Sequence, residues 1–434
     1  MTDSAAPAAA PAAAPPAHTT VCISGGGPAG MMLGLLLARA GIRVTVLEKH
    51  KDFFRDFRGD TIHTSTLELM RELGLLEAFL RLPHQKAYRL GGRFGSDDVT
   101  IGEFKYLPTP CKFVAFMPQW DFLDFLQRQA ACYPAFDLRM QTKATGLLRS
   151  QNAASPGRVS GVAYRTADGS KGELTADLVV ACDGRDSTLR HQSGLPVVDL
   201  GAPLDVLWFR LPRMANDPHD LLGRIDRGQA LVLIDRGDYW QCAYLIPKGG
   251  LAGLQARGLP SLRAAIAHIA PFAGARLEAA LPDWDALKLL SVQVNRLHRW
   301  HAPGLLCIGD AAHAMSPVGG VGINLAIQDA VATANILYPA LLQAQDQGVP
   351  IIDAMLEEVQ ARREKPTRLL QAFQLRVQDF LYSRVFAAGA APVRAPVLLR
   401  LVSRIPLLRG LLPRLVALGP RREHIVTPEM RAAS

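Results

Sequence analysis

The clearest pattern of hydrophobic positions lies near the start of the chain. Residues 19–24 and 43–47 are short apolar runs rich in β-branched side chains, which is typical of buried strands. Residues 28–40 between them are apolar over a length that fits a helix. A strand, a helix and a second strand in this order predict a parallel βαβ unit.

Three glycines connect the first strand to the helix, at Gly25, Gly27 and Gly30. The first permits a tight turn, the second lets the backbone approach a pyrophosphate, and the third lets the helix pack on the strand. The helix N-terminus then offers N–H groups and its positive dipole end to that pyrophosphate. Glu48, at the end of the second strand, is placed to bind a ribose 2′-hydroxyl. Because its carboxylate disfavours a 2′-phosphate, the motif predicts FAD or NAD rather than NADP.

Further along, the hydrophobic pattern predicts a second sheet. Alternating positions indicate antiparallel strands at 204–211, 229–234, 239–246 and 288–294, with a helix at 260–272. Apolar strands at 178–182 and 305–308 belong to the parallel sheet, and a helix at 323–345 follows. Ser65 and Glu68 fit a capping box at a helix start. Leucine-rich helices end the chain, and four prolines are expected to break them, at positions 366, 396, 406 and 413.

Length and composition fit a globular protein of two domains, with 434 residues, of which 49% are hydrophobic and 20% charged. The net charge of +9 is uneven, because eight arginines against two glutamates follow residue 385. The nearly neutral body predicts no nucleic-acid binding. The first 18 residues, mostly Ala and Pro, predict a disordered tail rather than a signal peptide, and no run is long enough for a transmembrane helix. The six cysteines form no metal-binding spacing and fit a cytoplasmic enzyme with reduced thiols.

Two further motifs follow the glycine-rich turn. Asp183-Gly184 comes directly after the apolar strand 178–182, and residues 309–324 contain Asp310, Pro317, Gly319, Gly320, Gly322 and Asn324. With these three motifs in this order, over roughly residues 20–340, the chain resembles the single-component (group A) FAD-dependent aromatic hydroxylases, the para-hydroxybenzoate hydroxylase family. The resemblance implies an α/β fold. It comprises a Rossmann-like FAD-binding domain, a second antiparallel-sheet substrate domain and a helical C-terminal region.

The domain boundaries expected from this resemblance leave the FAD-binding domain discontinuous. The tail covers 1–18, the FAD-binding domain 19–86, 118–200 and 295–345, the substrate domain 87–117 and 201–294, and the helical region 346–434.

The resemblance also implies which residues bind the cofactor. Asp310 would accept a hydrogen bond from the ribityl chain, and Pro317 would lie near the reactive flavin carbon. Arg58 and Gln119 match positions that contact the ribityl chain and the pyrophosphate, and Asp183-Gly184 is shared with the nicotinamide cofactor. The predicted cofactor-binding residues are Gly25, Gly27, Pro28, Ala29, Gly30, Glu48, Lys49, Arg58, Gln119, Asp183, Gly184, Asp310, Pro317, Gly319, Gly320, Gly322, Ile323 and Asn324. No metal is expected.

The implied activity is that of an FAD-dependent monooxygenase. It would use NADH or NADPH and O₂ to hydroxylate an apolar small molecule, with an aromatic one favoured, through a flavin C4a-hydroperoxide. No protein nucleophile is required, so catalytic residues stay unassigned. His63, near Arg58, and Gln241, in a predicted substrate-side strand, are the candidates. His313 is expected to be structural.

Two alternatives stay open. One is a flavin-dependent reductase or dehydrogenase of a polyprenyl or polyketide substrate, and the other is an FAD-binding protein without turnover. The sequence settles neither the substrate, nor NADH against NADPH, nor the oligomeric state.

Two surfaces are also left open by the pattern. In strand 239–246, Tyr239, Gln241 and Ala243 point to one face and Trp240 to the other, and either could meet the substrate. Residues 397–418 form a basic amphipathic stretch, which predicts either a weak peripheral membrane contact or a helix docked on the body with its arginines in water. The prolines favour the docked helix.

Overall fold

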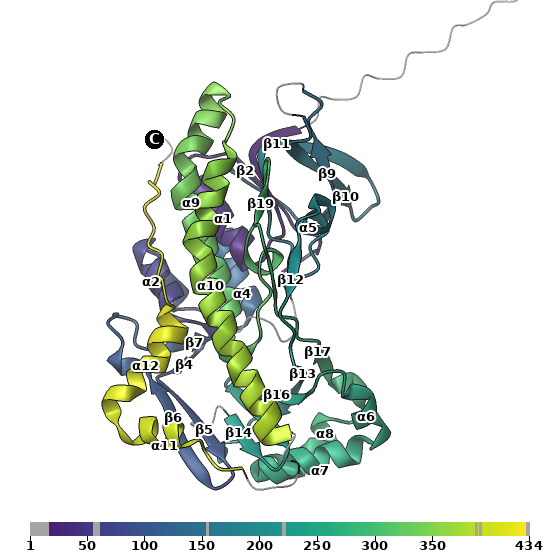
Figure 1. The fold of residues 1–434 in the computed structure, drawn as a ribbon, viewed down its shortest axis with the longest axis vertical. Coiled ribbons are helices and arrows are strands. Elements are labelled where there is room, and N and C mark those ends of the chain that lie inside the picture. Colours follow the sequence, from purple (N-terminus) through teal and green to yellow (C-terminus); the bar gives the residue numbers. More distant parts are fainter. Residues whose placement is uncertain are drawn as a thin grey trace, which may run out of the picture.

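The structure is a computed structural model that describes residues 17–54, 61–152, 156–218, 223–386, 389 and 393–430. A parallel sheet forms the upper part of the molecule and an antiparallel sheet the lower part (Figure 1). Two long helices, α9 (Val321–Gln347) and α10 (Asp353–Leu381), run beside the upper sheet, and α10 continues down to the lower one (Figure 1). This is the α/β fold that the sequence predicts.

The upper sheet has the strand order β19-β20-β11-β1-β2-β8, and β10 and β9 extend it from β11. The neighbours β20, β11, β1, β2 and β8 are parallel, and α1 (Pro28–Arg39) crosses between β1 and β2. The strands are β1 Ala17–Ser24, β2 Val44–Leu47, β8 Phe136–Arg139, β9 Thr142–Arg149, β10 Val159–Thr166, β11 Lys171–Ala181, β19 His301–Ala302 and β20 Leu305–Cys307.

Strand β1 begins earlier than the sequence predicts. Ala17 and His18 pair with Leu174 and Thr175 of β11, so these two residues of the predicted tail belong to the sheet. The rest of that tail, residues 1–16, lies outside the described residues.

The lower sheet has the order β17-β13-β16-β15-β14-β5-β6. β5 and β6, from the first quarter of the chain, join it where β5 runs parallel to β14. Helices α6 (Leu251–Ala256), α7 (Leu259–Ile269) and α8 (Leu277–Ala280) pack on one face. The strands are β5 Arg89–Phe94, β6 Asp97–Glu103, β13 Leu204–Pro212, β14 Gly223–Asp226, β15 Gln229–Asp235, β16 Tyr239–Pro247 and β17 Lys288–Leu290.

The predicted strand at 288–294 was wrong in its length. Only β17 belongs to the lower sheet, and β18 (Asn295–Leu297) pairs instead with β12 (Val197–Asp199). Between them the Val292 N–H donates to the carboxylate of Asp205, 2.9 Å away, rather than to a neighbouring strand. A side chain thus replaces the sheet ladder at this point.

Two local predictions about helices were also wrong. Pro366 lies buried inside α10 and does not break it, because tertiary packing of the helix on both sides of the proline outweighs the missing backbone hydrogen bond. Helix α2 (Thr64–Glu72) has His63 rather than Ser65 as its N-cap, with no side-chain cap. With His63 as N-cap, Glu68 stands at the fifth helical position rather than the third that a capping box requires, and its carboxylate binds Arg422 at 3.1 Å.

The remaining elements connect the two parts. A three-stranded sheet lies beside α2, and α4 packs against α1. By length and composition α9 could cross a membrane, but 67% of its most apolar window is buried, as in a core helix. The bounds are β3 Thr61–Ile62, β4 Gln85–Ala87, β7 Val114–Phe116, α3 Leu76–Phe79, α4 Gln119–Ala130, α5 Thr188–Ser193, α11 Val397–Arg404 and α12 Leu411–Pro413.

The last described residues, 414–430, form what we call the C-terminal strap. It runs from the lower part up the side of the molecule toward α1 (Figure 1). At its end the Met430 N–H donates to the carbonyl of Arg39, the last residue of α1. The strap therefore ties the lower part to the far end of the glycine-rich βαβ unit.

Candidate active site

The glycine-rich turn has the shape that a dinucleotide requires. Gly25 has φ +105°, and a Cβ there would lie 2.5 Å from the carbonyl oxygen of Cys182. A Cβ on Gly30 would lie 2.0 Å from the carbonyl oxygen of Gly25. Gly27 differs, because within the described chain no atom comes within 4 Å of where its Cβ would stand. Two glycines thus allow the turn to close, and the third leaves room for a phosphate above the start of α1.

Glu48 holds this turn from the end of β2. One carboxylate oxygen accepts the Gly26 N–H at 2.9 Å, and the other accepts the His50 N–H at 3.0 Å. A carboxylate at this strand end is also the acceptor that a ribose hydroxyl requires. Lys49, the next residue, is exposed.

Asp183-Gly184 lies beside the glycine-rich turn, since the Cys182 N–H donates to the Ser24 carbonyl at 2.8 Å. The Asp183 carboxylate accepts from the Ser187 hydroxyl, and burial raises the pKa of this carboxyl group. Arg190 lies buried in α5. Its guanidinium donates to the carbonyls of Arg185 and Ala311 and so joins the second motif to the third.

The third motif begins where β20 ends. Because β1, β2, β11 and β20 are parallel, the residues after them meet at one sheet edge, where ligands of such sheets bind. Gly309 has φ +58°, and a Cβ there would contact Ala29 at 3.4 Å. Asp310 is partly exposed and faces Arg185, with 3.8 Å between the charged atoms.

Asn324 fixes the loop that leads into α9. Its amide donates to the carbonyls of Thr61 and Gly320, at 2.8 and 3.0 Å. Its oxygen accepts the His63 N–H and the Thr66 hydroxyl, both at 2.8 Å. The side chain is thus fully used within the protein, so a bond from Asn324 to a cofactor would come from the backbone.

The N–H groups at the start of α9 have no side-chain cap. Gly319 and Gly320 have φ +77° and +61°, and the N-cap, Gly320, has no side chain to cap the helix. A Cβ on Gly320 would lie 2.7 Å from the side chain of Thr61, so only glycine fits there. Pro317 and Gly322 flank this turn, and Ile323 is buried behind it. The N–H groups can stabilise negative charge on a flat ring above the loop.

Two other predicted residues are less informative. Gln119 is half-buried at the first position of α4. Arg58 lies outside the described residues.

His63 connects the loop to the C-terminal strap. The ring is buried, and its Nδ1 lies 3.0 Å from the carbonyl oxygen of Val416. Burial lowers the pKa of His63 to about 4, although the carbonyls of Val416 and Gly319 favour the protonated ring. The neutral ring therefore holds the strap against the loop at pH 7, and its catalytic role stays a prediction.

The two faces of β16 pack against different parts of the molecule. Trp240, Cys242 and Tyr244 pack against α6–α8 and are covered. Ala243 lies on the other face, in a cluster with Trp208 of β13 and with strap residues 417 and 418. Gln241 shares this face, and its side-chain oxygen accepts two bonds from Arg236, at 3.0 and 3.1 Å.

A buried ionic network behind the third motif was not predicted. Asp329 accepts from His313 at 2.6 Å and from Arg363 at 3.0 Å, and Arg363 also binds Glu423 of the strap at 3.1 Å. Burial alone would raise the pKa of Asp329, but His313 and Arg363 hold it below its usual range. The Gly309 N–H donates to the same carboxylate, so the network positions the turn that carries Asp310. His313 is buried in this network, and its structural role stays a prediction.

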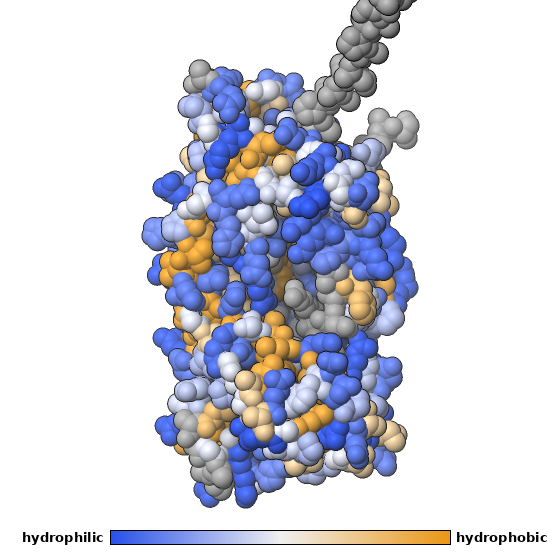
Figure 2. Space-filling view, turned by 90° about the vertical axis from the view of Figure 1, so that its right-hand side faces the viewer, coloured by the Kyte–Doolittle hydropathy of each residue, from blue (hydrophilic) through white to orange (hydrophobic). Residues whose placement is uncertain are grey.

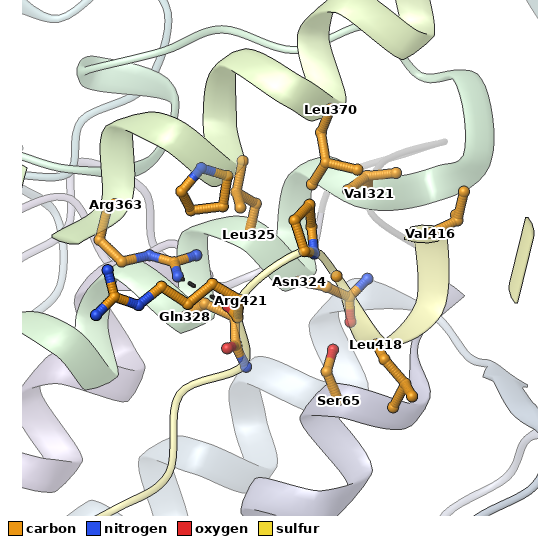
Figure 3. A pocket seen from close by; sticks show the side chains of 13 residues that line it. Ser65, Val321, Asn324, Leu325, Gln328, Arg363, Leu370, Val416, Leu418 and Arg421 are labelled. Atoms are coloured by element: carbon orange, nitrogen blue, oxygen red, sulfur yellow. Dashed lines mark hydrogen bonds between the residues drawn. The ribbon is translucent and has the colours of Figure 1, made fainter. Parts of the chain in front are cut away.

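A small cavity adjoins this network, between α2, α9, α10 and the strap (Figure 3). Its volume of about 20 Å³ fits one water molecule. Gln328 accepts the Glu423 N–H at 2.6 Å, while its Nε2 has no hydrogen-bond partner among the described residues. The cavity is therefore too small for a substrate. On another face, the molecule is hollowed at mid-height, between its upper and lower parts (Figure 2).

The glycine-rich turn allows a direct test of cofactor binding. We expect Gly27→Ala to leave the melting temperature of the apoprotein unchanged, because its φ of −75° suits alanine and the added methyl meets no atom of the described chain within 4 Å. The methyl would displace the phosphate, and losing one charged hydrogen bond costs roughly 1.5–3 kcal/mol, about tenfold or more in FAD affinity. Titration of the apoprotein with FAD, followed by flavin fluorescence, measures this. The control Gly253→Ala, also in open space, should bind FAD normally, and equal affinities of both variants would contradict the prediction.

Comparison with known proteins agrees with these motifs. A family model described as FAD binding domain matches residues 18–237 and 261–364. A 6-methylpretetramide 4-monooxygenase of Streptomyces rimosus is 34% identical over 406 residues, which cover 92% of each chain. A rifampicin monooxygenase of Streptomyces venezuelae is 29% identical over 71% of this chain and 62% of its own. The crystal structure of p-nitrophenol 4-monooxygenase PnpA from Pseudomonas putida DLL-E4 shares the fold, with a TM-score of 0.71 and 19% identity over 93% of this chain and all of that one.

The open cradle at Gly27, the Glu48 carboxylate and the uncapped N-terminus of α9 all fit FAD. The family model and the relative that aligns along nearly the whole chain point the same way. The chain therefore belongs to the FAD-binding-domain family and is an FAD-dependent monooxygenase of the group A type.

Proposed function

We propose that the protein hydroxylates a flat, apolar, aromatic small molecule, bound between the loop 317–322 and the lower sheet. One observation carries this proposal: three consecutive strap residues bridge the two surfaces. A Cβ on Gly319 would contact Val416 at 3.3 Å, and Ala417 and Leu418 belong to the apolar cluster of Trp208. The loop for the flavin ring and an apolar sheet face therefore lie close together.

Different predicted residues would bind different parts of the cofactor. The turn at Gly25, Gly27 and Gly30 would hold the pyrophosphate, Glu48 the ribose and Asp310 the ribityl chain. The N–H groups at the start of α9 would stabilise negative charge on the ring. When bound and reduced by NADH or NADPH, FAD supplies the activated oxygen. The protein positions the substrate and excludes water.

The name of the relative with 34% identity suggests the first substrate to test. We expect the purified holoenzyme to consume O₂ and NADH or NADPH when 6-methylpretetramide or another fused-ring phenol is added. The product should gain one oxygen atom from labelled ¹⁸O₂ by mass spectrometry. Substrate-independent NAD(P)H oxidation with peroxide release would contradict the choice of substrate. Product formation without O₂ uptake would support the alternative, a reductase.

The apolar face can be tested with two tryptophans. Trp208→Phe, on the face that we propose for the substrate, should raise KM and increase peroxide release. Trp284→Phe, on the helix-covered face, should change neither. Equal effects of the two substitutions would place the substrate elsewhere.

We further propose that the two sheets correspond to the FAD-binding and substrate domains with the predicted boundaries, and that the protein works in the cytoplasm. The pairing of β5 with β14 supports the first proposal. The six cysteines, all free thiols, support the second.

A further inference from the structure

Helix α11 docks on the body in an unexpected orientation. The sequence favours arginines in water and leucines on the body, but three apolar side chains, Val397, Leu398 and Leu401, are 72%, 68% and 46% exposed. The inward side is partly polar, because the Ser403 hydroxyl accepts the Thr100 N–H of edge strand β6 at 2.9 Å. The helix therefore presents its apolar side to the surroundings.

The apolar surface continues beyond α11. Leu407 is 82% exposed and Leu411 57%. In Figure 1, α11 and α12 lie at the lower end of the molecule, outside β6 and away from the upper sheet. We call the following residues the C-terminal apolar patch: Val397, Leu398, Leu401, Ile405, Leu407 and Leu411. A group of large apolar side chains of this size on a surface indicates an interaction site.

The segment that carries the patch bears charges of one sign only. From residue 380 to 422 the sequence has eight arginines and no Asp or Glu. Arg409 is neutralised by Glu103, 2.6 Å away, which fixes the segment to β6. Arg394, Arg404 and Arg414 are exposed beside the patch. A partner for this surface should therefore have an apolar interior that accepts the patch and a negatively charged outer layer that binds the arginines.

We propose that the C-terminal apolar patch docks the protein on an anionic membrane surface. The apolar side chains enter the boundary of the acyl chains, and the arginines bind the lipid phosphates. A second copy of the chain is the competing occupant. A two-fold contact through the patch would bring the arginines of one chain near the same arginines of the second chain. The repulsion between these like charges disfavours a dimer. The contact is peripheral, since α11 has only eight residues.

The test uses the full-length holoprotein and sedimentation with lipid vesicles. We expect it to pellet with vesicles of phosphatidylglycerol and phosphatidylcholine, and far less with phosphatidylcholine alone or in high salt. A variant without the apolar side chains should bind roughly tenfold less or weaker still, because about 0.8 kcal/mol is lost per buried methylene. This variant carries Leu398→Ser, Leu401→Ser and Leu407→Ser. Its control carries Leu289→Ser, Val349→Ser and Leu369→Ser, at sites exposed to 45–48% elsewhere.

A second pair of variants tests the charge. The first replaces the three exposed arginines, with Arg394→Gln, Arg404→Gln and Arg414→Gln, and should lose the preference for anionic vesicles. Its control replaces exposed cations of the upper part, with Lys143→Gln, Arg165→Gln and Lys171→Gln, and should keep it. FAD content and melting temperature show that every variant is folded.

Three results would overturn the proposal. The first is equal pelleting with both kinds of vesicle, and the second is equal loss in the patch variant and its control. The third is a dimer in light scattering without lipid that the Ser substitutions in the patch convert to a monomer. That result would show that a second copy covers the patch.

Discussion

Replacing Arg363 by methionine is expected to destabilise the holoprotein by roughly 3–5 kcal/mol, because it removes the buried cation that bridges two buried carboxylates. Arg363 is 1% exposed and bridges Asp329 and Glu423, whose side chains are 0% and 2% exposed. The variant keeps most of the side-chain volume, so the loss reports the charge rather than a cavity. The midpoint of urea unfolding, followed by circular dichroism and by flavin release, measures it.

The neighbouring arginine is a matched control. Arg362 also binds Glu423, at 2.8 Å, but its side chain is 38% exposed. Exposed ion pairs contribute about 0–1 kcal/mol, so Arg362→Met should change the midpoint little. If Arg363→Met does not fold, Arg363→Lys, which keeps the charge, should fold with an intermediate loss. Equal losses for Arg362→Met and Arg363→Met would show that burial does not decide the strength of this network.

The parts of the fold that the sequence predicts depend on local signals. The runs at 19–24 and 28–40 and the three glycines determine a βαβ unit by short-range sterics, and the structure confirms it. The prediction of a strand over 288–294 was wrong because the carboxylate of Asp205, more than 80 positions away, accepts the Val292 N–H. Pro366 was expected to end a helix, but tertiary packing on both sides of α10 holds the helix together.

The candidate site divides in the same way. The glycine spacing and the strand ends predict the phosphate-binding turn at Gly25, Gly27 and Gly30, because each of these residues acts through its own backbone. Arg363 and Glu423 carry no such signal: they are 60 positions apart and meet Asp329 only after α9, α10 and the strap have packed. The orientation of α11 could not be predicted either. The hydrophobic pattern shows which face of the helix is apolar, but not whether that face lies against the rest of the protein. Contacts between distant segments are thus what the sequence leaves undetermined.

The stability of the protein is expected to fall as the pH drops from 6.5 to 4, because of His63. Its pKa is about 4 in the folded protein against an ordinary value of 6.5. Above pH 6.5 the ring is neutral in both states and has no effect. Between the two values the unfolded chain binds a proton that the folded protein does not, so stability is lost as the pH falls, by roughly 3 kcal/mol in all.

His63→Gln should remove this part of the pH dependence, because glutamine can donate to the Val416 carbonyl but does not titrate. His191→Gln, at an exposed position, should retain the wild-type pH dependence and serves as the control. Melting temperatures between pH 4 and 8 measure the difference, and parallel curves for wild type and His63→Gln would contradict the assignment. Because the ring joins the strap to the loop at Gly319, FAD release should follow the same pH range in the wild type and shift to lower pH in His63→Gln. Release at an unchanged pH would mean that the strap does not hold the flavin loop.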